Sequence, residues 1–321
     1  MSLETKDLKP APPSGGAPAS VALEGNYFAP SLRQFRGMII FSVVLIIAFC
    51  RPLLALLEFA PHEELYSHIL LIPFITGYLI WAKRKELVPQ SQPNRALAVI
   101  PFAIGLAVLG IYEFGLRQGW RYQTPDYLAA MVLTFLCFLL AGAFLFVPRA
   151  YLKSIAFPIA FMAFCVPYPQ AMRMGIEIFF QHASAYAADA MLQLARMPVL
   201  RMGTFFLMPG FSLNVQPECS GIHSSIVLLI TSTLAAYMFL RSPYRRWTFI
   251  LFIIPLAIVR NGFRVFTLAE IGVHFDPLIL DSPFHHHGGP LFFLLSLIPL
   301  FLFLKYLIRC EERKGSLKTD K

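Results

Sequence analysis

The sequence predicts an all-α membrane protein with about eight transmembrane helices, and a short outer-face helix and hairpin before the sixth span. Of its 321 residues, 57% are hydrophobic and 14% are charged, and the mean hydropathy is +0.63. An ordinary soluble domain has about 25% charged residues. The apolar residues also gather in long runs, and about 20 such residues cross a hydrocarbon layer of roughly 30 Å.

These runs divide the chain. The expected spans are 38–59, 65–82, 96–114, 126–147, 150–168, 219–240, 247–265 and 290–308. Pro158 and Pro255 are expected to bend the fifth and seventh spans. Residues 1–32 are rich in Pro, Gly, Ala and Ser and predict a disordered tail that lacks the pattern of a signal peptide. Residues 33–310 form the multi-pass domain, and 311–321 a charged cytoplasmic tail.

The positions of lysine and arginine predict the orientation. With the N-terminus in the cytoplasm, 19 of the 27 lysines and arginines fall on the cytoplasmic side, 7 on the outer side, and Arg51 within the first span. Positive residues favour cytoplasmic loops, so both termini are placed in the cytoplasm. The net charge of +9 is then a topology signal and a contact with anionic lipid, and no nucleic-acid partner is expected.

One outer segment, 169–218, is long. Residues 175–197 have helical character, with alanines and a polar stripe, and 201–215 predict two short strands joined at Pro209-Gly210. No internal repeat is apparent, which weakens the case for a transporter built from duplicated halves.

Cys219 is the candidate nucleophile. Five cysteines without a CxxC pair argue against a disulfide framework and a zinc knuckle. Cys219 alone lies among polar and turn residues, after Pro217 and at the start of the sixth span. Free amides and the dipole of a first helical turn favour a thiolate. The alternative is a small residue that only starts the helix. The other four lie in apolar runs or in the charged tail: Cys50, Cys137, Cys165 and Cys310.

Two arginines end the seventh expected span. Seventeen residues from Trp247 place Arg264 about 25 Å across, near the outer face, and Arg260 one turn deeper. Arginines at such depth are functional candidates because burying them without a polar partner is costly. Asn261 shares a helix face with Arg264. A guanidinium can lower a thiol pKa or stabilise an oxyanion; the alternative is a snorkelling arginine at a span end.

Histidines supply candidate acid/base groups. The last outer loop carries His285, His286 and His287 just before the eighth span, and one of them could act as general acid/base for Cys219. Metal binding by these histidines with His274, Asp276 or Asp281 is a rival interpretation, and a polar interfacial loop is the plain one. His68 near the outer face is a candidate supporting group or an interface histidine.

The predicted topology brings these groups together. Cys219, Arg264 and His285 belong to three separate spans, yet the orientation places all three at the outer face. A thiol, a base and a cation at one place are what nucleophilic acyl transfer requires.

At these residues the sequence resembles the exosortase/archaeosortase family of membrane cysteine transpeptidase-like enzymes. Five stretches carry the resemblance, in the family's order: YSHILLIPFITGYLIWAKR at 66–84, FCVPYPQ at 164–170, LNVQPECSGIHSSIVLL at 213–229, NGFR at 261–264 and HHHGG at 285–289. They fall within residues 40–308.

The resemblance implies roles for individual residues. Cys219 would be the nucleophile, Arg264 the catalytic arginine and His285 the third member, since His285-x-x-x-Gly289 is similar to the family's spacing. Neighbours that could support these groups are Arg260, Asn261, His286, His287, Ser220 and His68. No cofactor or metal is implied.

The resemblance also implies substrates and a location. The family acts on secreted proteins with a C-terminal signal made of a short motif (often Pro-Glu-Pro), a hydrophobic helix and a basic cluster. The enzyme would cleave near the motif and pass the new C-terminus to a surface acceptor, in the inner membrane of a bacterium that makes extracellular polysaccharide. The active site would face the periplasm. A multi-pass transporter and a non-catalytic scaffold for polysaccharide export are the alternatives. A rhomboid-type serine protease lacks support because no Gly-x-Ser-x-Gly occurs.

Overall fold

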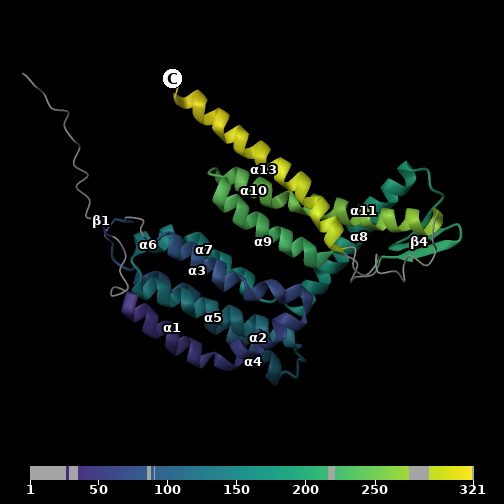
Figure 1. Ribbon diagram of the computed structural model, residues 1–321. Coiled ribbons are helices and arrows are strands. Elements are labelled where there is room, and N and C mark those ends of the chain that lie inside the picture. Colours follow the sequence, from purple (N-terminus) through teal and green to yellow (C-terminus); the bar gives the residue numbers. More distant parts are fainter. Residues whose placement is uncertain are drawn as a thin grey trace, which may run out of the picture.

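A computed structural model of the chain describes residues 27–28, 35–84, 88–89, 91–215, 221–274 and 289–319 (Figure 1). Helices dominate it. One group of helices comes from the first half of the chain, a second group from the last third, and α8, α11 and a small sheet lie together at one end (Figure 1).

The first group contains the helices up to residue 165. Its elements are α1 (Arg36–Ala48), α2 (Cys50–His62), the 3₁₀ helix η2 (Glu64–Leu70), α3 (Ile72–Ala82), η3 (Arg95–Ala98), α4 (Val99–Arg117), α5 (Thr124–Phe146), α6 (Arg149–Ser154), α7 (Ala156–Phe161) and η4 (Met162–Cys165). A short antiparallel pair, β1 (Tyr27–Phe28) with β2 (Val88–Pro89), joins the chain before α1 to the segment after α3.

The second group follows an insertion. The insertion holds α8 (Gln170–Leu194), β3 (Leu200–Met202), β4 (Phe205–Met208) and β5 (Phe211–Asn214). It is followed by α9 (Ile222–Phe239), α10 (Pro243–Leu251), α11 (Ile253–His274) and α13 (Gly289–Thr319).

Six helical segments in the described part of the chain are long and apolar enough to cross a membrane, or seven if the bent pair α1–α2 counts as one span. The expected count of eight is therefore not confirmed. The difference lies at 150–168, where the structure has the three short helices α6, α7 and η4 in place of one span. These three nevertheless lie along η2 and α3, so the chain still passes from one end of the bundle to the other there (Figure 1).

Proline explains where the helices break. Pro52, Pro158 and Pro255 each lie four residues after the last residue of a helix, namely Ala48, Ser154 and Leu251. A proline has no N–H to donate to the carbonyl four residues earlier, and its ring clashes with that carbonyl. At Pro52 the two helices meet at an angle of 72°.

The insertion has the expected bounds but contains one strand more than expected. Helix α8 has 25 residues and is not one of the candidate spans. Two strands were expected, but the structure has three, in the order β3-β4-β5, with β4 and β5 joined through Pro209-Gly210. The sheet packs its apolar face against α8 and α11, which makes a separate core there: Ala185, Ala188, Leu192, Phe206, Leu213, Val215, Val265, Leu268 and Ala269 are among its buried members.

Helix α11 is also longer than expected. It continues ten residues past Arg264 to His274, so the two arginines lie inside a helix and not at its end. Together α10 and α11 make a 32-residue segment, about 48 Å long, which exceeds a hydrocarbon layer of roughly 30 Å. Beyond Arg264, α11 belongs to the core that it shares with α8 and the sheet.

The tails differ in what the structure describes. Helix α13 runs through the charged residues after Cys310 to Thr319. Of the N-terminal segment 1–32, Tyr27–Phe28 forms β1, and the rest lies outside the described residues.

Candidate active site

Helix α9 begins directly after a glycine that has an unusual backbone conformation. Gly221 is the N-cap residue of α9 and has a φ of 70°, in the left-handed region that favours glycine. Its carbonyl accepts hydrogen bonds from the Ser225 amide at 3.0 Å, from Ser224 Oγ at 3.0 Å and from Ser225 Oγ at 2.7 Å. The helix therefore begins at Ile222, three residues later than the expected span, and a left-handed residue separates it from Cys219.

Helix α11 packs directly against Gly221. Arg260 Nη2 donates to the Gly221 carbonyl at 3.1 Å and to Ser225 Oγ at 3.2 Å. A Cβ atom at Gly221 would lie 2.9 Å from Arg260 Nη2 and 3.2 Å from Asn261 Oδ1. Arg260 and Asn261 are 8% and 2% exposed. The motif on α11 and the start of α9 are thus in van der Waals contact.

The burial of Arg260 decides between its two interpretations. A snorkelling arginine extends its guanidinium to the headgroup region, whereas the Arg260 guanidinium is buried between two helices. Arg264 follows it by one turn on the same side of α11 and is half-buried. The two cations therefore lie in a row that runs from the helix interface toward the end of the bundle.

A second motif packs against the start of α9. The 3₁₀ helix η2 carries Tyr66 and His68 and contacts α9. Glu64 on η2 lies 3.9 Å from Nδ1 of His223 on α9, an ion pair when the imidazole is protonated. Nδ1 of His68 is buried and has no hydrogen-bond partner in the described ranges. His68 was already a candidate from the sequence, whereas His223 was not, although it follows Cys219 by four residues.

The segment that carries Cys219 is held on both sides. Before it, Val215 is 2% exposed, its amide donates to the Thr204 carbonyl at 3.0 Å, and its own carbonyl accepts from Gln181 Nε2 of α8. After it, Gly221 is fixed by Arg260. Residues 216–220, and with them Cys219 and Ser220, lie outside the described residues.

The start of α13 also lies against α11. The Phe292 ring packs edge-on against the Phe263 ring, with centroids 6.1 Å apart. Phe263 precedes Arg264, and Gly289 at the start of α13 follows His285 by four residues. His285, His286 and His287 themselves lie outside the described residues.

Close packing with α8 holds α11 in this place. A Cβ atom on Gly262 would lie 2.7 Å from Ala187 Cβ and 3.1 Å from the Ala188 amide nitrogen. Only a glycine allows the two helices to approach so closely. The start of α8 is anchored in turn by Asp126, whose carboxylate accepts from the Gln123 amide at 3.0 Å and from the Gln170 amide at 2.8 Å.

A metal site at the triple histidine was the rival interpretation of the last outer loop. Within the part of the chain that the structure describes, no group of three or more His, Cys, Asp and Glu side chains could hold a metal ion. The triple histidine belongs to the residues outside that part.

Comparison with known families decides the class of this chain. The family model for the transmembrane exosortase matches residues 60–302. The chain belongs to the transmembrane exosortase family. This exosortase is, in general terms, a multi-pass membrane protein of a family of protein-sorting transpeptidases. Neither the curated proteins nor the solved structures gave a significant match. All the contacts between motifs described above lie within the matched range.

Proposed function

We propose that this exosortase is a membrane cysteine peptidase and transpeptidase that cleaves the C-terminal sorting signal of secreted proteins at the outer face of the membrane. Cys219 is the nucleophile, Arg264 the catalytic arginine and His285 the general acid/base. The contact of Arg260 with Gly221, at 3.1 Å, carries the proposal. It joins the arginine motif of α11 to a residue that is two positions from Cys219.

Chain connectivity limits how far the thiol can be from this contact. Two residue steps span at most about 7 Å between Cα atoms, so Cys219 remains close to Gly221 and to α11. The contact of Phe292 with Phe263 brings the start of α13 to the same helix. The described starts of α9 and α13 thus both lie against α11 near Arg260–Arg264, which supports the proposed site.

The chemistry follows from the three side chains. The Cys219 thiolate attacks the carbonyl carbon of the scissile peptide bond, while Arg264 stabilises the negative charge that develops on the carbonyl oxygen. The carbon–nitrogen bond breaks, the imidazolium of His285 gives its proton to the leaving amine, and the new C-terminus remains as a thioester. An acceptor nucleophile then loses its proton to the imidazole, attacks the thioester and releases the thiolate.

The substrate would lie beside the bundle. We expect a secreted protein whose signal combines a short motif, a hydrophobic helix and a basic cluster. Its helix would cross the membrane parallel to the spans with the basic cluster in the cytoplasm. The motif would then lie at the end of the bundle that holds Gly221 and Arg260, where the peptide bond is cleaved and passed to a surface acceptor.

The positions of the basic residues support an orientation of the protein in the membrane. The opposite end of the bundle carries Arg241, Arg245 and Arg246, and also the end of α13. We therefore propose a bacterial inner membrane protein with both termini in the cytoplasm and the site facing the periplasm. A membrane-impermeant maleimide that labels Cys219 in intact spheroplasts supports this orientation. Labelling only after permeabilisation contradicts it.

Substrate processing in cells tests the proposal. A candidate substrate is co-expressed with the full chain, and its C-terminus is determined by mass spectrometry. We expect Cys219→Ala and Arg264→Gln to abolish processing, and of the three histidines His285→Ala to do so. Cys165→Ala, at a cysteine that is 5% exposed in the core, is the matched control and should process normally. Normal processing by Cys219→Ala would leave a transporter or a scaffold as the better interpretation.

A further inference from the structure

An apolar groove lies between α5 and the broken segment formed by α6, α7 and η4. Its cavity has a volume of about 460 Å³, and at one end α1 and α3 contribute Phe35, Met38 and Ile80 to its walls. On α5 its lining follows one face of the helix from Leu133 to Val147, about 21 Å along the axis. The proposed mechanism makes no use of this groove.

The break in the helix and small side chains leave this space open. Pro158 lies four residues after Ser154, where α6 ends and the chain turns into α7. Apart from the Cys137 thiol and Tyr151, every lining side chain is apolar, and three of them are alanines: Ala143, Ala160 and Ala163. Water needs two to four polar partners to occupy a cavity, whereas an empty space costs its walls their van der Waals contacts. A hydrocarbon chain therefore fits this groove best.

The end of the groove at Phe35 and Tyr151 is basic. These two rings pack with their centroids 5.4 Å apart. Arg149 and Lys153 on α6 are exposed and flank Tyr151, and Arg36 is exposed and follows Phe35. The described ranges 35–38, 79–84 and 147–155, which pack together at this end, contain no Asp or Glu but hold five basic residues: Arg36, Lys83, Arg84, Arg149 and Lys153.

We propose that this groove binds an anionic glycerophospholipid, with an acyl chain between α5 and α7 and the phosphate beside Arg36, Arg149 and Lys153. Basic pockets between membrane helices on the cytoplasmic side are typical sites for acidic lipid headgroups, and the lysine and arginine positions predict that this end is cytoplasmic. The groove is longer than one leaflet of the hydrocarbon layer, which is about 15 Å thick, so a chain of that leaflet can lie along it. The inference goes beyond the proposed function and does not depend on the proposed catalysis.

A transmembrane helix of a partner protein is the rival occupant. A second cavity of about 540 Å³ shares Leu133, Ala163 and Val166 with the groove and continues along α5 to Asp126. The space is thus long enough for a helix. A transmembrane helix, however, ends on the cytoplasmic side with Lys or Arg, which the basic residues at this end would repel. The charges therefore favour the lipid.

The test is lipid retention by the full chain, reconstituted in nanodiscs of equal parts phosphatidylglycerol and phosphatidylcholine. The protein is extracted in a mild detergent, and the lipids that stay bound are identified by native mass spectrometry. We expect phosphatidylglycerol to be retained in at least about fivefold excess over phosphatidylcholine. Replacing both α6 cations, Arg149→Gln with Lys153→Gln, should bring this ratio close to one. The matched control is Lys305→Gln with Arg309→Gln, at exposed basic residues of α13, and should leave the ratio unchanged.

A second variant tests the part of the groove that would hold the acyl chain. Ala160 lines the groove and is exposed, so the ring of Ala160→Phe occupies the groove without entering the core. We expect retained phosphatidylglycerol to fall by at least about fivefold, because the chain loses much of its buried apolar surface. Ala103→Phe, at another exposed alanine on α4 that does not line the groove, should retain as much lipid as wild type. If Ala160→Phe does not fold, the Arg149→Gln and Lys153→Gln pair decides alone.

Three results would overturn the inference. One is equal retention of the two lipids by wild type, and another is a ratio that Arg149→Gln with Lys153→Gln leaves unchanged. The third is a photocrosslink from Ala160→p-benzoylphenylalanine to the hydrophobic helix of a co-expressed substrate and not to lipid, which would assign the groove to a partner helix. The retention measurements need no substrate processing, so their failure leaves the proposed function untouched, and an active Cys219→Ala variant would leave the lipid site untouched.

Discussion

The hydroxyl of Tyr66 donates a hydrogen bond to the carbonyl of Tyr168 at 3.1 Å, across 102 residues of sequence. Tyr66 is 1% exposed and its ring also packs on Phe59, with centroids 5.3 Å apart. The bond ties η2 to the chain that leads into α8. Since η2 contacts α9 and α8 contacts α11, this hydrogen bond links the two elements that pack against the candidate site.

Removing this hydroxyl should destabilise the protein. Tyr66→Phe keeps the ring but leaves a carbonyl without its donor, which we expect to cost about 1 kcal/mol. Thermal unfolding of the purified protein in detergent measures the change. Tyr78→Phe on the next helix is the matched control, because Tyr78 is 62% exposed, and it should unfold like wild type. Equal unfolding temperatures for both variants would show that the bond adds nothing.

Gly221→Ala should affect both stability and processing. The left-handed backbone costs an alanine about 1–2 kcal/mol, and its Cβ would meet Arg260 Nη2 at 2.9 Å. We expect substrate processing to be lost at expression levels where wild type is fully active. Gly77→Ala, in a helix with nothing within 4 Å of the new Cβ, should be neutral or stabilising by roughly 0.5–1 kcal/mol. An active Gly221→Ala enzyme would contradict the geometry at the start of α9.

Gly262→Ala tests the contact between α8 and α11. Its Cβ would lie 2.7 Å from Ala187 Cβ and 3.1 Å from a backbone nitrogen, which cannot move without shifting the helix. Overpacking of this kind costs roughly 1–3 kcal/mol, so the variant should unfold at a lower temperature and process substrate more slowly. Gly175→Ala on α8 itself has open space for its Cβ and should behave as wild type. A stable, fully active Gly262→Ala variant would show that the two helices separate easily.

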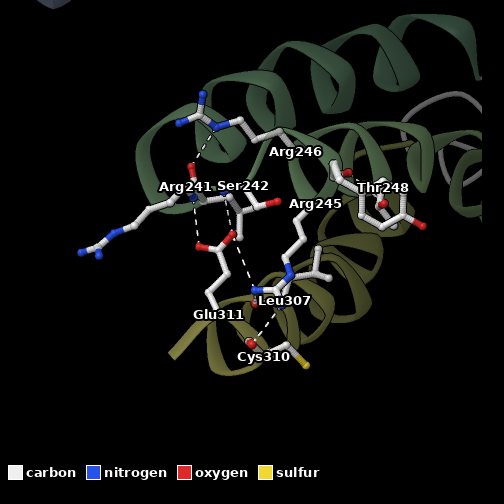
Figure 2. A network of polar contacts seen from close by, with 10 residues as sticks. Arg241, Ser242, Arg245, Arg246, Thr248, Leu307, Cys310 and Glu311 are labelled. Carbon is white, nitrogen blue, oxygen red and sulfur yellow. Dashed lines mark hydrogen bonds and ion pairs between the residues drawn. The ribbon is translucent and has the colours of Figure 1, made fainter. Parts of the chain in front are cut away.

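Glu311 tests the far end of the molecule. Its carboxylate accepts from the Arg241 amide at 3.0 Å and the Ser242 amide at 2.9 Å, just before α10, and lies 3.6 Å from Arg245 Nη1 (Figure 2). Glu311, which lies on α13, therefore caps the start of α10. We expect Glu311→Ala to lower the free energy of unfolding by about 1–2 kcal/mol, with processing per folded molecule unchanged. Glu312, the exposed neighbour of Glu311, supplies the control, and Glu312→Ala should change neither unfolding nor processing. If folded Glu311→Ala processed substrate more slowly, the contacts of Glu311 would influence the candidate site.

Much of the fold could be predicted from apolar runs, because a span must bury its backbone hydrogen bonds within one helix. The apolar run at 150–168 was predicted to be one span, but the structure has three short helices there. It is long and apolar enough, but Pro158 breaks it, and a broken segment is tolerated where neighbouring helices such as η2 and α3 cover it. A bend at Pro158 was expected there, but three short helices were not.

The predicted end of α11 was also wrong, and the reason is physical. Polar residues at 260–264 predicted a span boundary, yet the helix continues because α8 and the sheet bury its next turns. Such tertiary contacts are invisible in local hydropathy. The third strand, β3, was missed similarly, because three residues pair with β4 only once the turn at Gly203 is formed.

The sequence pointed to some of the residues that the structure brings together at the start of α9, while their roles stay predictions. Polar residues that interrupt apolar runs, above all Arg260 and Asn261, were identified as functional candidates. That Arg260 binds the Gly221 carbonyl could not be foreseen, because this depends on how α9 and α11 pack. The contacts of Ser225 with Arg260 and of His223 with Glu64 could not be predicted either, because each residue lies in an otherwise ordinary helical turn.

Trapping the acyl-enzyme tests the central claim most directly. Full-length enzyme and substrate are incubated in detergent without an added acceptor, quenched in acid and digested, and the peptides are sequenced by mass spectrometry. We predict a hydroxylamine-sensitive thioester between the Cys219 sulfur and the new C-terminus of the substrate, absent from Cys219→Ala. Processing without any adduct in wild type, and at the same rate in Cys219→Ala, would contradict the account.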